Sequence, residues 1–355
     1  MKALLTTPFT PISKNVSSHR SAQGVIYADQ IKSSGVDLDI AMTGNIPEDY
    51  NQYDELYVYH GNDWGGTLNM FGGVKEYGNI DEVIRLSKFK GKVYSIGIPY
   101  PDYYNMLKPR IDSTEGAHPD WKLVDWDNFQ RIQNEADIVH PNEMIMSRSI
   151  AIGDSHAICM YRPGWQVNSV PFKTLHGALK TGLQSFIPEG EFDNIEFYFG
   201  NIDVRHHLMR QDNPVDATKK LAVEYMRQAM MIADKYNAKV KVYELLPIEN
   251  ESRKLPKTGY YKGTPFFGSQ GERNYTRLIF RDECEKYQAI GRHDPDVKVY
   301  RWVDRMINGK GELDFEYMEK PKSVHLSRNY YPHWQGLEWN GVRHEVTNTL
   351  EDFFV

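Results

Sequence analysis

The chain has 355 residues, a length typical of two domains and sufficient to bury a sizeable core. Its 48 acidic residues outnumber 42 Lys and Arg residues, and the formal charge of −6 leaves only a local nucleotide or DNA contact open. Two cysteines exclude a disulfide framework, and no stretch approaches the roughly 18 apolar residues of a membrane span, so we expect a cytoplasmic protein without a membrane partner.

Short apolar runs alternate with helical patterns through residues 1–146. The predicted strands are residues 2–6, 36–42, 55–59 and 92–98, and the predicted helices are residues 22–32, 80–87 and 127–136. The stretch 99–126 is rich in Pro, Tyr and Trp and has no clear periodicity. This alternation predicts a parallel sheet in an N-terminal Rossmann-like α/β domain.

A second alternating series fills residues 147–355. Its predicted strands are residues 149–152, 194–199, 239–245 and 297–302, and its predicted helices are residues 215–236, 275–290 and 342–353. Apolar residues spaced by three or four along 215–236 indicate one buried helix face. Residues 249–270 carry many charges with Gly and Pro and are expected to form a long loop. The series predicts a second α/β domain with a parallel sheet.

Ser155 lies where the chain turns from a strand into the next element. The sequence Gly153-Asp-Ser-His-Ala follows an apolar run directly, so the Ser155 hydroxyl can stand at the carboxyl edge of a parallel sheet. That position suits a nucleophile, with helix N–H groups available for a developing oxyanion. The alternative is an ordinary N-cap serine in a turn.

A serine nucleophile needs a base and an oxyanion donor, and two later segments supply candidates. Asn201 follows the strand 194–199, so its amide can lie at the same sheet edge. His325 lies near the end of the chain, after the last predicted strand, where a loop can return it to Ser155. Taken alone, each residue has a structural alternative, as a turn former or as a packing histidine.

In this order, the blocks resemble those of the SGNH or GDSL-like hydrolase superfamily. The blocks are Gly153-Asp-Ser155, the glycine Gly177, Gly200-Asn201 and Ser323-Val-His325, covering roughly residues 147 to 340. The resemblance implies a three-layer α/β/α, flavodoxin-like fold with a Ser155 nucleophile and a His325 base. It also implies an oxyanion hole formed by the N–H groups of Ser155 and Gly177 and the side chain of Asn201.

The last block departs from the family pattern. Family members have an Asp three residues before the His, whereas this chain has Lys322, which cannot accept an imidazole N–H. We therefore expect a Ser–His dyad whose histidine is oriented by a main-chain carbonyl or by a carboxylate such as Asp314 or Glu316. The alternative is a fold that has lost hydrolysis and serves binding or transfer.

Further residues near these blocks are expected to contact the substrate. They are Asp154, His156, Asp203, Arg205 and Lys322. An Arg at a sheet edge can hold a carboxylate or phosphate, although a surface ion pair is an equally good interpretation of Arg205. No HxH, HxxxH or HExxH spacing occurs, and we expect neither a metal nor a cofactor.

The N-terminal domain carries a separate resemblance. Two of its loops contain Arg20 and Asp63, which we expect to contact a ligand, and no GxGxxG or Walker A sequence is present. The layout of residues 53–59, 70–73 and 92–96 is similar to the N-terminal half of phage DNA glucosyltransferases.

Three functions follow from these patterns. The first is a serine esterase or O-acyltransferase acting on an acylated carbohydrate or similar polar substrate, with the N-terminal domain recognising that substrate. The second is a glycosyltransferase or other transferase that modifies DNA bases. The third is a non-catalytic carbohydrate-binding protein, which the lysine at position 322 keeps open. The oligomeric state is not predicted.

Overall fold

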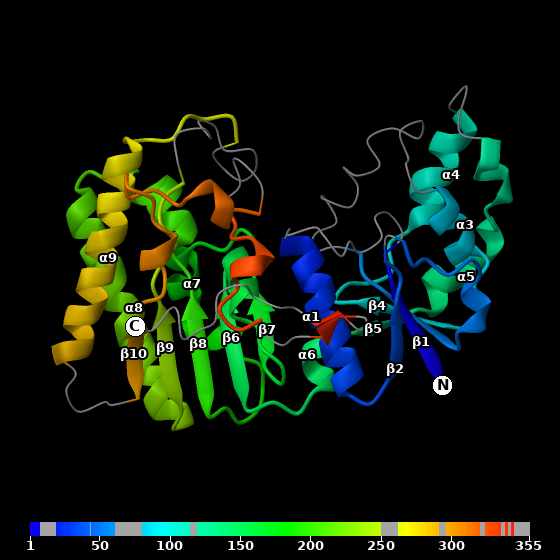
Figure 1. The fold of residues 1–355 in the computed structure, drawn as a ribbon, viewed down its shortest axis with the longest axis horizontal. Helices are drawn as coiled ribbons and strands as arrows, with labels where there is room; N and C mark the ends of the chain where they lie inside the picture. Colours follow the sequence, from blue (N-terminus) through cyan, green and yellow to red (C-terminus); the bar gives the residue numbers. More distant parts are fainter. Residues whose placement is uncertain are drawn as a thin grey trace. The chain divides into compact units, whose positions relative to one another are not determined.

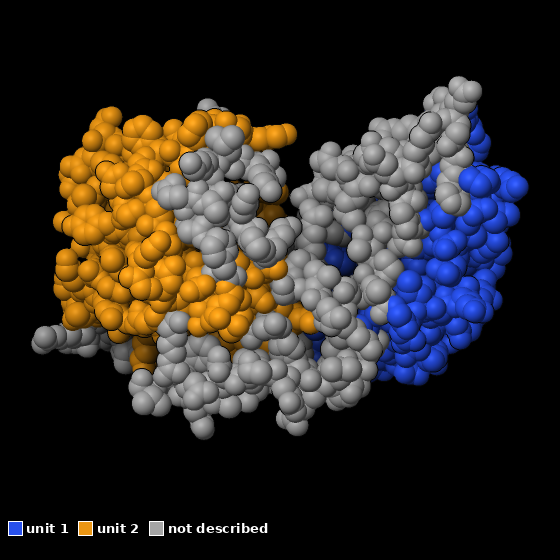
Figure 2. Space-filling view, turned by 45° about the horizontal axis from the view of Figure 1, so that its top comes forward, with its two compact units in different colours: residues 1–16, 23–145, 339–341 blue, residues 17–22, 146–338, 342–355 orange. Residues whose placement is uncertain are grey.

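The computed structural model describes residues 1–7, 19–42, 44–60, 80–113, 119–249, 262–290, 296–319, 324–334, 338–339 and 342–343. The chain divides into two compact units (Figure 2): unit 1 contains residues 1–16, 23–145 and 339–341, and unit 2 contains residues 17–22, 146–338 and 342–355. Each unit is built on a five-stranded parallel sheet, which confirms the predicted α/β class. No helix of the described part is long and apolar enough to cross a bilayer.

Unit 1 has the strand order β2-β1-β3-β4-β5. The strands are β1 (Lys2–Thr6), β2 (Asp37–Ile40), β3 (Glu55–Val58), β4 (Lys92–Ile96) and β5 (Asp137–Val139). The helices are α1 (His19–Ser33), which belongs to unit 1 from residue 23 onward, α3 (Ile80–Ser87), α4 (Tyr103–Ser113), α5 (Trp126–Glu135) and α6 (Pro141–Met144). Figure 1 shows α1 on one face of this sheet and α3, α4 and α5 on the other. Because both faces are covered, consecutive residues of β1, from Ala3 to Leu5, are all buried.

Unit 2 repeats this topology, with the strand order β10-β9-β8-β6-β7. Its strands are β6 (Ser149–Gly153), β7 (Gln166–Ser169), β8 (Asn194–Tyr198), β9 (Lys239–Tyr243) and β10 (Val297–Tyr300). Its α-helices are α7 (Leu175–Thr181), α8 (Pro214–Tyr236) and α9 (Gln270–Ile290). Numbered from the first strand of each unit, both sheets have the order 2-1-3-4-5, so each has a topological switch point between its first and third strands.

The two faces of the unit 2 sheet are covered differently. On one face α8 buries the predicted stripe, with Tyr225 packing against Phe197 of β8 and Phe280 of α9. On the other face Tyr198 and Tyr243 pack against Trp302. This second face is covered by the 3₁₀-helix η4 (Ser155–Met160) and by the irregular segment that begins at Trp302.

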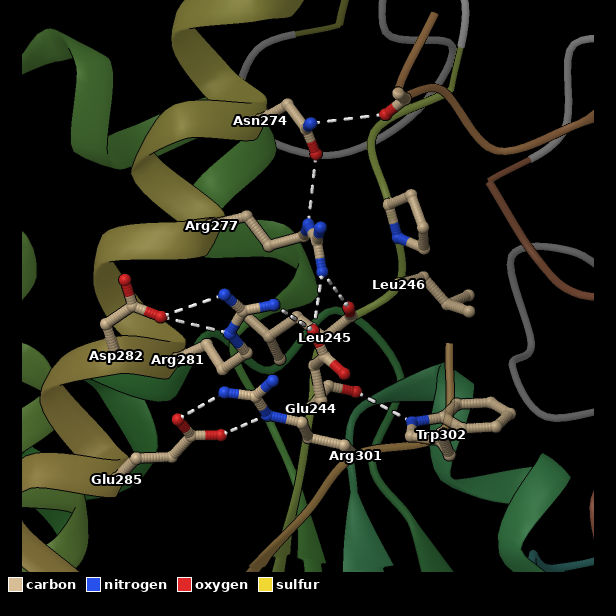
Figure 3. A network of polar contacts seen from close by, with 12 residues as sticks. Glu244, Leu245, Leu246, Asn274, Arg277, Arg281, Asp282, Glu285, Arg301 and Trp302 are labelled. Carbon is tan, nitrogen blue, oxygen red and sulfur yellow. Dashed lines mark hydrogen bonds and ion pairs between the residues drawn. The ribbon is translucent and has the colours of Figure 1, made fainter. Parts of the chain in front are cut away.

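A buried ion-pair network joins α9 to the end of β9 (Figure 3). The Glu244 carboxylate accepts hydrogen bonds from the guanidinium groups of Arg277 at 3.0 Å and Arg281 at 3.3 Å. The backbone carbonyl of Glu244 accepts the indole N–H of Trp302 at 2.8 Å. Burial raises the pKa of Glu244 and lowers that of Arg277, although each charge stabilises the other. The network fixes the chain just beyond β9, where the carboxyl edge of the sheet begins.

Some elements were not predicted. The helix α4 lies in the stretch without clear periodicity and contains Pro109, and β7 is a short polar edge strand. The predicted terminal helix is wrong for Val342 and Arg343, which form β12 and pair with β11 (Glu338–Trp339). The rest of that prediction lies outside the described residues.

Short single-turn helices complete the described elements: η1 (Tyr50–Gln52), η3 (Pro119–Leu123), η5 (Leu183–Phe186), η7 (Leu208–Arg210), η8 (Asp304–Met306), η9 (Phe315–Tyr317) and η10 (Arg328–Tyr330).

Candidate active site

Ser155 stands at the switch point of the unit 2 sheet. Strand β6 ends at Gly153, which is in register with Tyr198 at the end of β8. A Cβ atom on Gly153 would lie 2.2 Å from the Tyr198 carbonyl oxygen, so only glycine permits this close approach. The Asp154 side chain then caps η4 by accepting the His156 N–H at 2.9 Å. Ser155, the first residue of η4, is therefore presented at the carboxyl edge of the sheet, as the sequence predicts.

His325 contacts this serine from 170 positions further along the chain. The distance between Ser155 Oγ and His325 Nε2 is 2.8 Å, which is a hydrogen bond. His325 is held in a short antiparallel pairing in which Met318 bridges Leu326. In that pairing the Glu319 N–H donates to the His325 carbonyl at 3.0 Å. The hydroxyl and the imidazole that the sequence pairs are thus brought together.

The carboxylate beside the imidazole belongs to Glu319. Its Oε1 lies 3.6 Å from His325 Nδ1, an ion-pair distance, and its side chain is only 4% exposed. We expected here a main-chain carbonyl or a carboxylate of the loop from Asp314 to Glu319, such as Asp314 or Glu316. The carboxylate that the structure places here comes from that loop but is Glu319, because the antiparallel bridge brings position 319 alongside position 325. Sequence inspection alone offers no signal that separates these three acidic residues.

The side chain of Asn201 is fixed beside Tyr198. Burial raises the pKa of Tyr198, and the Asn201 side chain opposes this as a hydrogen-bond donor. Its Oδ1 accepts the Leu246 N–H at 3.1 Å and faces the Arg205 guanidinium at 3.4 Å. Its Nδ2 is buried. Asn201 lies three residues beyond Tyr198, at the edge where Ser155 also lies. The arrangement places one buried amide donor at the end of β8.

Gly177 does not supply the second donor that the family resemblance implies. Its N–H donates to the hydroxyl of Thr174, the N-cap of α7, at 3.0 Å. The two preceding N–H groups, those of Leu175 and His176, donate to the carboxylate of Asp203. The first turn of α7 therefore has no free proton for an oxyanion. The Ser155 N–H, in contrast, has no acceptor among the described residues.

The polar residues on either side of Ser155 face inward. Asp154 is fully buried and its Oδ1 lies 2.6 Å from His156 Nδ1. His156 is 5% exposed, and its other ring nitrogen lies 3.0 Å from the Val324 carbonyl oxygen. The expectation that these two side chains contact substrate is therefore not met, because both are occupied by partners inside the protein.

Asp203 and Arg205 are also structural in this arrangement. Both lie in the π-helix η6 (Asp203–His207) and are 1% and 2% exposed. Burial raises the pKa of Asp203 to about 7, against the opposing effect of the two N–H groups of α7. Arg205 forms a buried ion pair with Glu249 at 2.8 Å and donates to the Asn201 carbonyl. The predicted role of Arg205 in anion binding is thus replaced by the support of Asn201.

Three predicted ligand contacts lie outside the part of the chain that is described. They are the side chain of Arg20, and the residues Asp63 and Lys322. The stretch 70–73, which contributed to the glucosyltransferase resemblance, lies outside it as well. Within the described ranges, no group of three or more His, Cys, Asp or Glu side chains is placed to hold a metal ion.

Comparison with known proteins finds low similarity to the solved structures described below. No family model and no curated protein matches the sequence. A Streptococcus pneumonia protein described as a platelet activating factor is 18% identical, over 53% of this chain and 79% of its own, with a TM-score of 0.38. T4 phage β-glucosyltransferase bound to UDP-glucose is 10% identical, over 83% of this chain and 96% of its own, with a TM-score of 0.28. The same enzyme with UDP and Mn²⁺ is 12% identical, over 81% and 97%, with a TM-score of 0.32. At these values neither likeness assigns a function.

Proposed function

We propose that unit 2 is a serine esterase or O-acyltransferase in which Ser155 is the nucleophile and His325 is the general base. The observation that supports this most directly is the 2.8 Å contact between Ser155 Oγ and His325 Nε2. A base within hydrogen-bond reach of a hydroxyl is the minimum requirement for activating serine. The location at a topological switch point adds support, because ligands of open α/β sheets bind there.

The proposed reaction has two steps, acylation of Ser155 and removal of the acyl group. Ser155 Oγ forms a bond to the ester carbonyl carbon as His325 Nε2 takes its proton. The tetrahedral intermediate collapses, and the leaving alcohol departs with that proton, leaving an acyl group on Ser155. Water or an acceptor hydroxyl then attacks the acyl-enzyme, with His325 again accepting a proton and returning it to Ser155. Glu319 stabilises the imidazolium formed in both steps.

Two donors are proposed for the developing oxyanion. They are the backbone N–H of Ser155, which has no acceptor within the described ranges, and the buried Nδ2 of Asn201, which lies beside the Tyr198 hydroxyl. Donors that are fixed before the reaction stabilise the transition state without reorganisation, and one such donor contributes about a hundredfold or more in rate. The acyl group is proposed to be carried by a carbohydrate or similar polar molecule, as expected from the sequence.

A fluorophosphonate probe tests this proposal. Intact-mass measurement should show one adduct per chain, peptide mapping should locate it on Ser155, and Ser155→Ala should abolish it. Ser185→Ala is the matched control, because Ser185 is an exposed serine of the same unit and should leave labelling unchanged. Absence of an adduct on the wild-type protein, or an adduct that survives Ser155→Ala, would overturn the proposal.

A further inference from the structure

The side chain of His156 bridges two parts of the candidate site without facing solvent. Its Nδ1 lies 2.6 Å from Asp154 Oδ1 and its Nε2 lies 3.0 Å from the Val324 carbonyl oxygen. Its ring centroid is 4.7 Å from that of His325, with the rings tilted by 40°. We infer that His156 is a positioning residue that carries protons on both ring nitrogens and holds the backbone of Val324, and thereby the imidazole of His325, in register with Ser155. This inference rests on the proposed function of Ser155 and His325.

The count of protons follows from the two partners. A main-chain carbonyl can only accept, and an ionised carboxylate can only accept, whereas a neutral imidazole has one N–H to offer. Two hydrogen bonds therefore require two protons on the pair formed by Asp154 and His156. The inference places the shared proton on the ring, so that both ring nitrogens donate, Nδ1 to Asp154 and Nε2 to Val324. The result is a buried ion pair with no net charge, which does not oppose the positive charge that forms on His325.

The bond to Val324 has a direct consequence for His325. The Val324 carbonyl belongs to the planar peptide group whose nitrogen is that of His325, so fixing the oxygen fixes that plane. On the other side, the His325 carbonyl accepts the Glu319 N–H at 3.0 Å. Both peptide groups that flank His325 are thus held, one by His156 and one by Glu319. The direction in which the His325 side chain leaves the backbone is set by these two bonds.

The bridging residue His156 directly follows the nucleophile Ser155 in the chain. Asp154, Ser155 and His156 are consecutive in the chain. The position of the Ser155 hydroxyl is therefore linked directly to that of His156, which contacts the residue before His325. Asp154 completes the unit by accepting from both the N–H and the ring of His156. A displacement of the base by about 1 Å costs about a hundredfold in rate, so removing the bridge should slow the chemical step and leave substrate binding unchanged.

Two substitutions separate the two hydrogen bonds. His156→Gln places an amide donor near the position of Nε2 and can still hold the Val324 carbonyl. His156→Asn places its donor near the position of Nδ1. This variant can retain the hydrogen bond to Asp154 but loses the one to the Val324 carbonyl. We expect the maximal rate of fluorophosphonate labelling of Ser155 to fall by about a hundredfold in His156→Asn and by less than tenfold in His156→Gln, with an unchanged half-saturating probe concentration in both. Equal rates in the two variants, whether both fast or both slow, would overturn the inference.

A measurement on the wild-type protein tests the protonation of His156 directly. Its result depends neither on the proposed esterase activity nor on whether the variants fold. Nitrogen-15 NMR of the histidine rings should show both nitrogens of His156 protonated at neutral pH, with the signal assigned by its loss in either variant or by its contact with Val324. A single protonated ring nitrogen would overturn the inference even if Ser155 reacts with the probe. Two protonated nitrogens in a protein that the probe does not label would sustain the bridge to Val324 while overturning the proposed esterase.

Discussion

Replacing Glu319 with glutamine tests whether the carboxylate acts on His325. The wild-type carboxylate lies 3.6 Å from Nδ1, with side chains 4% exposed for Glu319 and 16% exposed for His325. Two unit charges about 4 Å apart near a protein surface attract by about 4 kcal/mol, and each 1.4 kcal/mol is tenfold in rate. The imidazolium formed in the reaction should therefore lose stabilisation corresponding to about a thousandfold in rate. The glutamine amide can also donate to Nδ1, which would leave the imidazole proton on Nε2, facing the serine.

The rate of Ser155 phosphonylation, followed by intact mass at several probe concentrations, measures this loss. We expect the maximal rate of Glu319→Gln to fall by between a hundredfold and ten-thousandfold, with little change in the probe concentration that half-saturates it. Glu316→Gln is the matched control, because Glu316 is an exposed glutamate of the same segment and should label at the wild-type rate. A Glu319→Gln protein that labels as fast as wild type would show that the carboxylate does not assist the base.

Three further predictions concern stability. Gly153→Ala should lower the free energy of unfolding by about 1–3 kcal/mol and slow labelling, because its Cβ would meet the Tyr198 carbonyl, whereas Gly309→Ala, with no atom within 4 Å of its Cβ, should change neither. Arg277→Met should cost about 3 kcal/mol in urea unfolding because it leaves Glu244 buried with one partner fewer, and adding Glu244→Gln should restore part of it; a loss below about 0.5 kcal/mol would contradict the assigned pair. Because burial raises the pKa of Asp203 to about 7 from an ordinary 3.8, the unfolded chain releases this proton first as pH rises. Wild-type stability relative to Asp203→Asn should therefore fall between about pH 4 and 7, by up to about 4 kcal/mol, and parallel curves for the two proteins would contradict it.

The sheets could be predicted from the sequence because their strands are buried on both faces. Apolar runs such as residues 149–152 and 194–199 stand out against the polar segments between them, and a long amphipathic helix such as α8 is equally visible. The edge strand β7 has the sequence Gln-Val-Asn-Ser, which is indistinguishable from a loop. The helix α4 contains an internal proline and depends on tertiary packing, with Tyr103 and Leu107 in the unit 1 core.

The approach of Ser155 to His325 could be anticipated from a motif, but the supporting residues could not. Glu319 becomes the partner of His325 only through the bridge between Met318 and Leu326, which no local pattern announces. The N–H of Gly177 is taken by Thr174, a capping contact that depends on where α7 begins. Burial likewise decides that Arg205 supports Asn201 and Glu249 rather than a ligand.

Each of the four residues from Gly153 to His156 has its own role at the end of β6. Gly153 permits the end of β6 to pass close to Tyr198, Asp154 caps η4 and engages the next histidine, Ser155 carries the hydroxyl, and His156 reaches Val324. The four residues are consecutive, so the cap formed by Asp154 and the position of the Ser155 hydroxyl are encoded locally, whereas the contacts with Tyr198 and Val324 depend on the fold. The base is different, because His325 depends on contacts with two separate segments, one holding each of its peptide groups. A change in the segment that contains Glu319 should thus disable the site while leaving the Gly-Asp-Ser-His sequence and the fold of β6 intact.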